Sequence, residues 1–395
     1  MSTHMPPKPA APRRPRAAAA RLTAPGWNAK TRAALEQLIL TGAGQRLPVV
    51  FDFDNTVIHG DIGEATFGVL ARSGKINPAQ LPPTLTPAFR PNGKNKVTLA
   101  TCADVAEYYD ALQSPTVHGE NDPAPLTTAY AWVVEIMAGL RLSEVIAATQ
   151  EVCDLSEAGQ ERFITVTPGK TTFPVPAFYP EMVELLAQLI RHEFEVWIVS
   201  ASNVWSVRWL VRQLLNPRLQ DAGAARGITA DHVIGMASLL CDDDDRLYKD
   251  SVLVRENPDY AALETSALRP FRLTSRLQYP LPAYSGKVAC IFDAIGRPPY
   301  LCAGDGPGDH AMLAASQHRL WIDRLEKPRL QHATAKLVRR TGEAGWMFQA
   351  TSATDAPRFL EQPPADSANP VIFHPLPTTG SANLLQRPTS SKSKL

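Results

Sequence analysis

The stretch "PVVFDFDNTVIHGDIGEATF", residues 48–67, decides the fold because an apolar run ends directly in two aspartates. Residues 48–51 are typical of a short buried strand, and Asp52 and Asp54 follow with one residue between them. A buried carboxylate without a partner is energetically expensive. The pair therefore requires a cation or a chemical task, and other parts of the chain should supply the groups for it.

Strands alternate with helices around this stretch and beyond residue 172, which predicts a parallel α/β sheet. The predicted elements of that alternation are a helix from Trp27, a strand over 46–54, a helix from Pro180, a strand over 194–200, a helix over 203–215, a strand over 232–240, a helix over 286–296, and strands over 298–306 and 318–324.

A long segment with helical patterns interrupts the alternation. It contains predicted helices over 64–74, 97–113, 125–140 and 142–163, with little strand pattern. The fold class expected is thus α/β, with a Rossmann-like parallel-sheet core and an inserted, mainly α-helical cap. The expected domains are a disordered extension (1–24), the core (25–59 and 173–348), the cap (60–172) and a disordered tail (349–395).

Composition excludes several classes of protein. The 395 residues carry a formal net charge of +1, which gives no global field toward nucleic acid or a membrane surface, and neither is expected as a partner. Five cysteines without a C-x-x-C pair argue against a disulfide framework or a zinc site. The N-terminal extension is Arg-rich and acid-poor like a mitochondrial presequence, but its repeated prolines would break the amphipathic helix such a presequence needs.

Polar residues follow three of the predicted strands, at the sheet edge where open parallel sheets form active sites, and one more lies at the start of a predicted helix. They are Asp52, Asp54 and Thr56 after the first strand, Ser200 after the second, Asp305 and Asp309 after a later one, and Lys287 at the start of the helix before it. Each residue type suits phosphoryl transfer. A carboxylate can attack phosphorus, a second one can carry the proton, and Mg²⁺ prefers carboxylate oxygens.

The motifs "DFDNT", "VWIVS", "GK" and "GDGPGD" in this order resemble the haloacid dehalogenase superfamily of phosphohydrolases, over roughly residues 46–345. The resemblance implies Mg²⁺ as cofactor and an aspartyl-phosphate intermediate. It makes Asp52 the nucleophile and Asp54 the general acid/base, with Asp52, Asp54, Asp305 and Asp309 around the metal. Thr56 would support the loop and help to bind the substrate. Ser200 and Lys287 would bind phosphate, and Lys287 would also take part in catalysis. Lys249, in "RLYKD", is a rival for the position of Lys287.

The insertion after the first motif is similar to the phosphoserine-phosphatase-like branch of that superfamily. Asn55 and Glu64, however, resemble the bacterial phosphorylcholine phosphatases, and this resemblance makes Glu64 a contact for a cationic head group. Aromatic residues could complete a cage around such a cation or could be ordinary core residues. They are Tyr108, Tyr109, Tyr130, Trp132, Trp205 and Trp209.

The expected function is Mg²⁺-dependent hydrolysis of a small phosphate monoester that is phosphocholine- or phosphoserine-like. Two alternatives stay open: a phosphotransferase or phosphomutase of the same superfamily, and a non-catalytic metabolite-binding protein. The chain ends Ser393-Lys394-Leu395, which matches a peroxisomal import signal. An import receptor as partner and a peroxisomal or glycosomal location are therefore expected, with the cytoplasm as the alternative.

Overall fold

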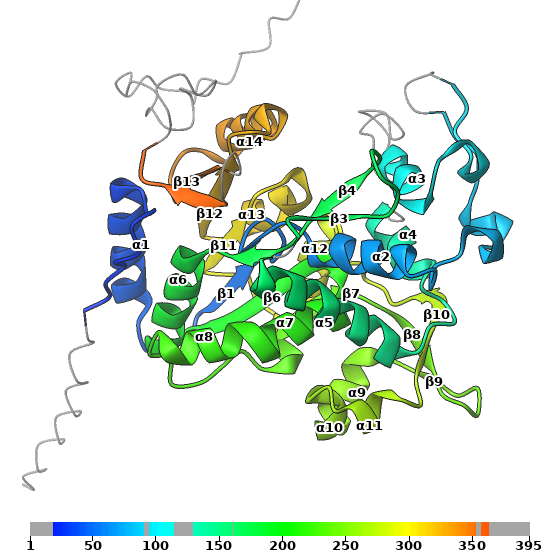
Figure 1. The fold of residues 1–395 in the computed structure, drawn as a ribbon. Helices are drawn as coiled ribbons and strands as arrows, with labels where there is room; N and C mark the ends of the chain where they lie inside the picture. The colour runs from blue at the N-terminus through cyan, green and yellow to red at the C-terminus, as the bar shows by residue number, and fades with distance from the viewer. Residues whose placement is uncertain (1–18, 91–94, 114–128, 160, 353–356, 363–395) are drawn as a thin grey trace, which may run out of the picture.

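A seven-stranded sheet forms the centre of the protein in the computed structural model, which describes residues 19–90, 95–113, 129–159, 161–352 and 357–362 (Figure 1). Six strands are parallel, and β14 pairs antiparallel at one edge. In spatial order the strands are β14 (Arg358–Leu360), β13 (Trp346–Ser352), β12 (His318–Arg324), β11 (Leu301–Gly304), β1 (Pro48–Phe51), β6 (Glu195–Asn203) and β7 (Val233–Met236).

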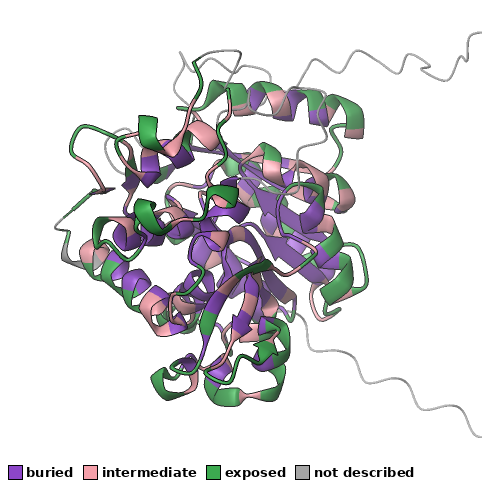
Figure 2. Ribbon diagram, turned by 90° about the vertical axis from the view of Figure 1, so that its right-hand side faces the viewer, coloured by how far each residue is buried: buried purple, intermediate pink, exposed green. Residues whose placement is uncertain are grey.

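Helices cover both faces of this sheet, so its strands are buried through most of their length (Figure 2). Along β1, Val49 and Phe51 belong to one apolar cluster and Val50 to the other, as the two-residue period of a strand requires. The Val50 face carries α12 (Ser285–Ile295), α13 (His310–Ala315) and α14 (Pro328–Thr341). The opposite face carries α1 (Ala29–Gly42), α6 (Pro180–Arg191), α7 (Val204–Leu210) and α8 (Asn216–Asp221).

A mainly helical insertion follows β1 and packs beside the sheet (Figure 1). Its elements are α2 (Ile62–Arg72), α3 (Val105–Leu112), α4 (Ala129–Glu135), α5 (Leu142–Ala158), β3 (Phe163–Thr165) and β4 (Thr172–Pro174). Two short strands at its base, β2 (Ile58–His59) and β5 (Ala177–Phe178), pair with each other. The predicted class is therefore confirmed: a Rossmann-like parallel α/β core with a mainly helical insertion. The expected boundaries between the core and the cap stay a prediction.

One predicted strand, over 232–240, is in fact two strands in different sheets. Only β7 joins the central sheet, while β8 (Ser238–Cys241) pairs antiparallel with β9 (Leu247–Tyr248) and β10 (Arg272–Leu277). The burial of β8 alternates along the strand, which fits a small sheet with one open face. The helices α9 (Asp250–Glu256), α10 (Pro258–Ala261) and α11 (Thr265–Leu268) connect β9 to β10.

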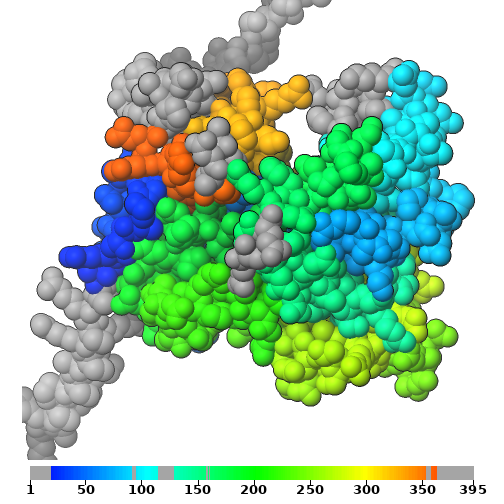
Figure 3. Space-filling model, in the orientation of Figure 1, coloured from blue at the N-terminus to red at the C-terminus, as the bar shows by residue number. Residues whose placement is uncertain are grey.

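The expected disorder at both ends of the chain is wrong for the residues nearest the core. Residues 349–352 belong to β13 and 358–360 form β14, so the sheet continues beyond residue 348. Helix α1 lies against these C-terminal strands (Figure 3), where Asn28 N donates to Gln349 Oε1 (2.8 Å). Near the N-terminus Leu22 is buried, and its N–H donates to Glu36 (2.9 Å). Composition was a poor guide here because short apolar pieces of these segments find partners in the core.

The rest of the predicted extension and tail, including Ser393-Lys394-Leu395, lies outside the described residues. None of the helices that the structure describes has the length and apolar character to cross a bilayer.

Candidate active site

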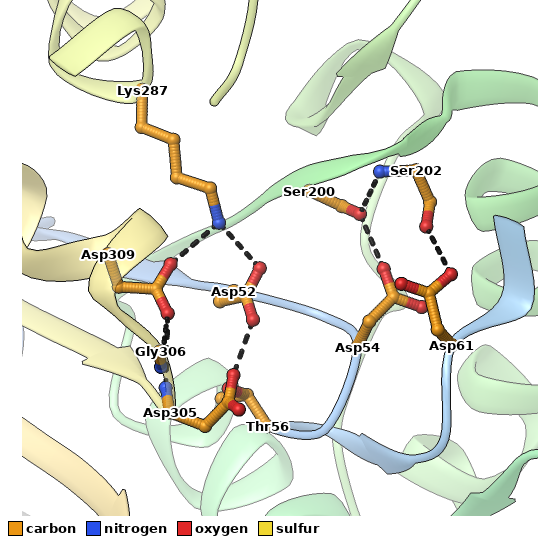
Figure 4. A network of polar contacts seen from close by, with 10 residues as sticks. All are labelled: Asp52, Asp54, Thr56, Asp61, Ser200, Ser202, Lys287, Asp305, Gly306 and Asp309. Atoms are coloured by element: carbon orange, nitrogen blue, oxygen red, sulfur yellow. Dashed lines mark hydrogen bonds and ion pairs between the residues drawn. The ribbon is translucent and has the colours of Figure 1, made fainter. Parts of the chain in front are cut away.

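The carboxyl ends of β1 and β11 bring Asp52 and Asp305 together, as Figure 4 shows. The two strands are neighbours, and the N–H of Asp52 still donates to Ala303 O (3.0 Å), which extends their parallel pairing by one residue. Thr56 joins the two acids, because its Oγ1 lies 3.1 Å from Asp52 Oδ2 and 3.4 Å from Asp305 Oδ1. The predicted supporting role of Thr56 thus has a geometric basis.

The loop after β1 turns sharply at Asn55, whose φ is 57°. This left-handed conformation disfavours most residues, but Asn adopts it at little cost. The turn is closed by Asn55 N, which donates to Gly60 O (3.0 Å), and by Val57 N, which donates to Phe53 O (2.8 Å). Asn55 of the "DFDNT" motif therefore permits the backbone turn that orients Asp52 and Asp54.

Lys287 reaches the acids from the first turn of α12. Its Nζ donates to Asp52 Oδ1 at 2.6 Å and to Asp309 Oδ1 at 2.7 Å, and the three side chains are almost fully buried. The two carboxylates raise the pKa of Lys287 although burial opposes this, so the ammonium stays charged. Lys249, the rival in sequence, instead lines a separate cavity beside β7, at the N-terminus of α9. The structure thus brings Lys287 to the acids.

Asp309 binds Lys287 and also holds the turn after β11. Its Oδ2 accepts from the N–H groups of Asp305 (3.1 Å) and Gly306 (3.0 Å). Gly304 is required for this close approach, because a Cβ there would lie 2.6 Å from Cβ of Asp309. The "GDGPGD" motif is therefore a compact turn that fixes Asp305 against β1.

Asp54 points away from this group toward the next strand, β6. Its Oδ2 accepts from Ser200 Oγ (2.7 Å) and its Oδ1 from Ile62 N (2.8 Å). Burial, together with the nearby charge of Asp61, raises the pKa of Asp54 to about 7. A carboxylic acid with a pKa near neutrality can both donate and accept a proton.

Ser200 was predicted to bind phosphate, but in the structure its hydroxyl serves Asp54 and also accepts from Ser202 N (2.9 Å). Two residues further along β6, Ser202 Oγ donates to Asp61 Oδ1 (2.8 Å). Asp61 also caps α2, since the same oxygen accepts from Glu64 N (2.9 Å). Two parallel serine–aspartate pairs therefore join the end of β6 to the start of the insertion.

Asp52, Asp305 and Asp309 each offer a carboxylate oxygen, and these three oxygens lie within 4.8 Å of one another. Burial and the neighbouring Asp309 raise the pKa of Asp52 well above its usual value, while Lys287 lowers it. Burial likewise raises the pKa of Asp305 to about 6. Such a crowded set of hard oxygen donors fits Mg²⁺. The Asp54 carboxylate, which was also predicted as a ligand, lies outside this group of oxygens.

Glu64 lies on α2 at a cleft of about 630 Å³ between the insertion and the core. The cleft is lined by Asn55, Asp61, Glu64, Tyr109, Tyr130 and Arg324, among others. Glu64 Oε1 accepts from Tyr109 Oη (3.0 Å) and Gln113 Nε2 (2.7 Å), which fixes its carboxylate at the wall. Burial raises the pKa of Glu64, and these two hydrogen bonds oppose the rise.

Only some of the candidate aromatic residues lie at this cleft. Tyr109 and Tyr130 line it. Tyr108 and Trp132 are core residues that donate to the carbonyl groups of Pro87 (2.7 Å) and Leu85 (2.5 Å). Trp205 is also buried, and its Nε1 donates to Asp250 Oδ1 (3.0 Å). Trp209 packs against the same core.

Sequence reasoning missed Ser202 and Arg324. The signal for Ser202 was its two-residue spacing from Ser200, which puts both hydroxyls on one face of a strand. Arg324 is the last residue of β12, and its Nε lies 3.1 Å from Asp305 Oδ2. The end of that predicted strand could have been included among the strand ends that form the site.

Comparisons with known proteins show the fold. No protein-family model matches the sequence, and no curated protein matches it. A solved structure of a conserved, functionally unknown protein from Anaerococcus prevotii DSM 20548 is 18% identical, with a TM-score of 0.57, and the match covers 86% of this chain and 97% of that chain. This likeness shows that the fold recurs in another protein.

Two further similar structures have TM-scores too low to support an argument. One is a protein of unknown function from Bordetella pertussis Tohama I (14% identity, 77% of this chain and 97% of that chain, TM-score 0.43). The other is a substrate-bound phosphoserine phosphatase (12% identity, 73% and 90%, TM-score 0.32).

Proposed function

We propose that the protein is a Mg²⁺-dependent phosphomonoester hydrolase of the haloacid dehalogenase superfamily. One observation carries the proposal: Asp52, Asp305 and Asp309 converge at one edge of the sheet, with Lys287 bound between two of them. Asp54, which has a pKa near neutrality, stands two residues from Asp52. A nucleophile, a proton carrier, a phosphate-binding ammonium and a metal-binding acid cluster are thus in one place.

The reaction proceeds in two displacements. An oxygen of Asp52 forms a bond to phosphorus while the ester P–O bond breaks, and the leaving oxygen takes the proton of Asp54. Asp54 then removes a proton from water, and that water oxygen displaces Asp52 from phosphorus. Asp52, Asp305 and Asp309 would hold Mg²⁺, which when bound neutralises negative charge on the phosphoryl group. Lys287 donates to phosphoryl oxygens, and Ser200 keeps the Asp54 carboxyl in place.

The substrate is a small ester whose leaving group carries a cation, as in phosphocholine or phosphoserine. Glu64 supports this, because its fixed carboxylate and the rings of Tyr109 and Tyr130 line the cleft beside Asp54. A carboxylate next to aromatic rings attracts an ammonium group.

A phosphate-release screen tests the proposal. The wild-type protein should release phosphate from one or more small esters with Mg²⁺ and not with a chelator, and Asp52→Asn should release none. Phosphoryl transfer to an added alcohol, without phosphate release in its absence, would favour the phosphotransferase alternative. Binding of esters with no turnover would favour the non-catalytic alternative.

A further inference from the structure

Arg324 is a cationic residue of the cleft that the proposed reaction does not use. It ends β12, and its side chain is only 17% exposed. Nε lies 3.1 Å from Asp305 Oδ2, but the geometry is poor, and within the described residues Nε makes no hydrogen bond. A guanidinium carries five N–H donors. The ion pair with Asp305 therefore leaves most of the hydrogen-bonding capacity of Arg324 available to a ligand.

Arg324 faces the space outside the phosphoryl-binding pocket. The cleft is lined by Arg324, Asn55 and Glu64, and Asp52 and Lys287 are not among its lining residues. The leaving group of an ester attacked by Asp52 would occupy this cleft. Arg324 is accordingly placed to contact the leaving group, whereas Lys287 is placed to contact the phosphoryl group.

The two walls of the cleft carry sheltered charges of opposite sign. The insertion contributes the carboxylate of Glu64, and the core contributes the guanidinium of Arg324, which is close enough to lower the pKa of Glu64. Two other charged residues of the core wall, Glu326 and Lys327, are exposed to solvent, where charges interact weakly. Asp61 and Glu64 are thus the sheltered acids of this cleft, and Arg324 is its sheltered cation among the described residues.

We propose that Arg324 binds a carboxylate on the leaving group, so that the substrate carries both an ammonium and a carboxylate beside its phosphate ester. This rests on the proposed function and names the substrate class. The planar guanidinium matches a carboxylate through two parallel hydrogen bonds. A purely cationic leaving group such as choline would leave the remaining donors of this sheltered guanidinium without a partner, which costs binding energy.

Two matched pairs of esters test the role of Arg324. Phosphoserine and phosphoethanolamine differ only by a carboxylate, and 3-phosphoglycerate and glycerol 3-phosphate differ mainly in one. Arg324→Gln should lower kcat/KM for the carboxylate member of each pair by roughly 10- to 100-fold, the usual loss for a hydrogen bond to a charged group. The partner without the carboxylate should change by less than about threefold, because the phosphoryl site is intact.

Two further variants separate recognition of the substrate carboxylate from the effect of net charge in the cleft. Arg324→Lys keeps the charge but loses the planar fork, and it should recover only part of the activity toward phosphoserine. Lys327→Gln removes an exposed cation from the same cleft and should change neither pair. Calorimetric titration with Mg²⁺ measures how far loss of the ion pair with Asp305 changes the metal affinity, so each kcat/KM is measured at saturating Mg²⁺. Thermal unfolding checks that each variant is folded.

Several results would overturn the role of Arg324. One is an equal loss in Arg324→Gln for both members of each pair at saturating Mg²⁺, which would mean that Arg324 acts only through Asp305. Another is a wild-type protein that prefers phosphoethanolamine to phosphoserine. Absence of phosphate release from every ester would refute the hydrolase itself. In that case, calorimetric binding of phosphoserine and phosphoethanolamine to the Mg²⁺-loaded protein still tests Arg324.

Discussion

The ammonium of Lys287 lies 2.6 Å from Oδ1 of Asp52, although the two residues are 235 positions apart in the sequence. This contact joins the end of β1 to α12, the helix that precedes β11. It also places a fixed positive charge beside a carboxylate whose pKa burial raises well above its usual value. Burial and the neighbouring acids favour the protonated form of Asp52, and Lys287 is the neighbour that favours the ionised form that a nucleophile requires.

Mg²⁺ should stabilise the folded protein. Asp52, Asp305 and Asp309 repel one another at close range, and a bound divalent cation removes that repulsion. Saturation to about 100 times the Kd adds about 2.7 kcal/mol to the free energy of unfolding. Thermal melts with Mg²⁺ and with a chelator measure the shift in Tm.

Asp305→Asn should greatly reduce that Mg²⁺-dependent shift, since it removes one of the three carboxylates. Asp244→Asn, in the exposed acidic loop before β9, is the matched control and should leave the shift unchanged. If Asp305→Asn melts with the same shift as wild type, the cation binds elsewhere.

Gly304→Ala should impair the site, whereas Gly308→Ala in the same motif should not. A Cβ on Gly304 would lie 2.6 Å from Cβ of Asp309, so the turn that holds Asp305 and Lys287 must move. No atom lies within 4 Å of a Cβ on Gly308. We expect at least a tenfold loss of phosphate release for the first variant, by the sensitivity of catalysis to misplacements of about 1 Å. Equal activities would contradict the packing described for this turn.

Asp54→Asn should slow hydrolysis of alkyl phosphates by roughly 10²- to 10⁴-fold, the usual contribution of a general acid. An aryl ester such as p-nitrophenyl phosphate should lose much less in its first displacement, because its leaving oxygen needs no proton. Pre-steady-state release of p-nitrophenol measures that step. A loss of the same size for both kinds of ester would assign Asp54 a role other than proton donation.

Asp323 should make the protein less stable as the pH rises. It is fully buried beside Trp321, one of its oxygens has no hydrogen-bond partner among the described residues, and burial raises its pKa to about 7. The unfolded chain therefore ionises Asp323 near pH 4 while the folded chain retains the proton. The contribution of Asp323 to the free energy of unfolding is fully present below pH 4. It falls as the pH rises from 4 to 7 and is constant above pH 7.

Asp323→Asn removes this titration. Its free energy of unfolding relative to wild type should rise between pH 5 and pH 8 by roughly 2 to 3 kcal/mol. Denaturant unfolding at the two pH values measures the difference. A difference that does not change with pH would show that Asp323 is ionised in the folded protein throughout this range.

The sequence predicted the parts of this protein that depend on local pattern. The apolar run before Asp52 and the later strand ends are short-range signals, and the rule that parallel strands end at one edge brings their polar residues together. Lys287 could be preferred over Lys249 by its place at the start of a helix. These local signals were enough to predict the core and its acidic cluster.

The remaining features depend on contacts that local pattern does not encode. The segment over 232–240 has one continuous apolar pattern, and only its long-range pairing divides it between two sheets. Residues 349–351 pair with β12, and composition alone cannot predict this long-range pairing. Ser200 has the residue type of a phosphate ligand, yet its hydroxyl is used by Asp54. Arg324 was missed because a charged residue at the end of a strand usually faces solvent.

Acid-quenched samples taken during turnover test the central claim most directly, because phosphoryl groups on aspartate survive acid. Mass spectrometry of peptides should show one phosphoryl group on Asp52 in the presence of Mg²⁺ and an ester substrate, and none when the metal is chelated. Phosphate release with Asp52 unmodified throughout, or a phosphoryl group on any other residue, would contradict the account.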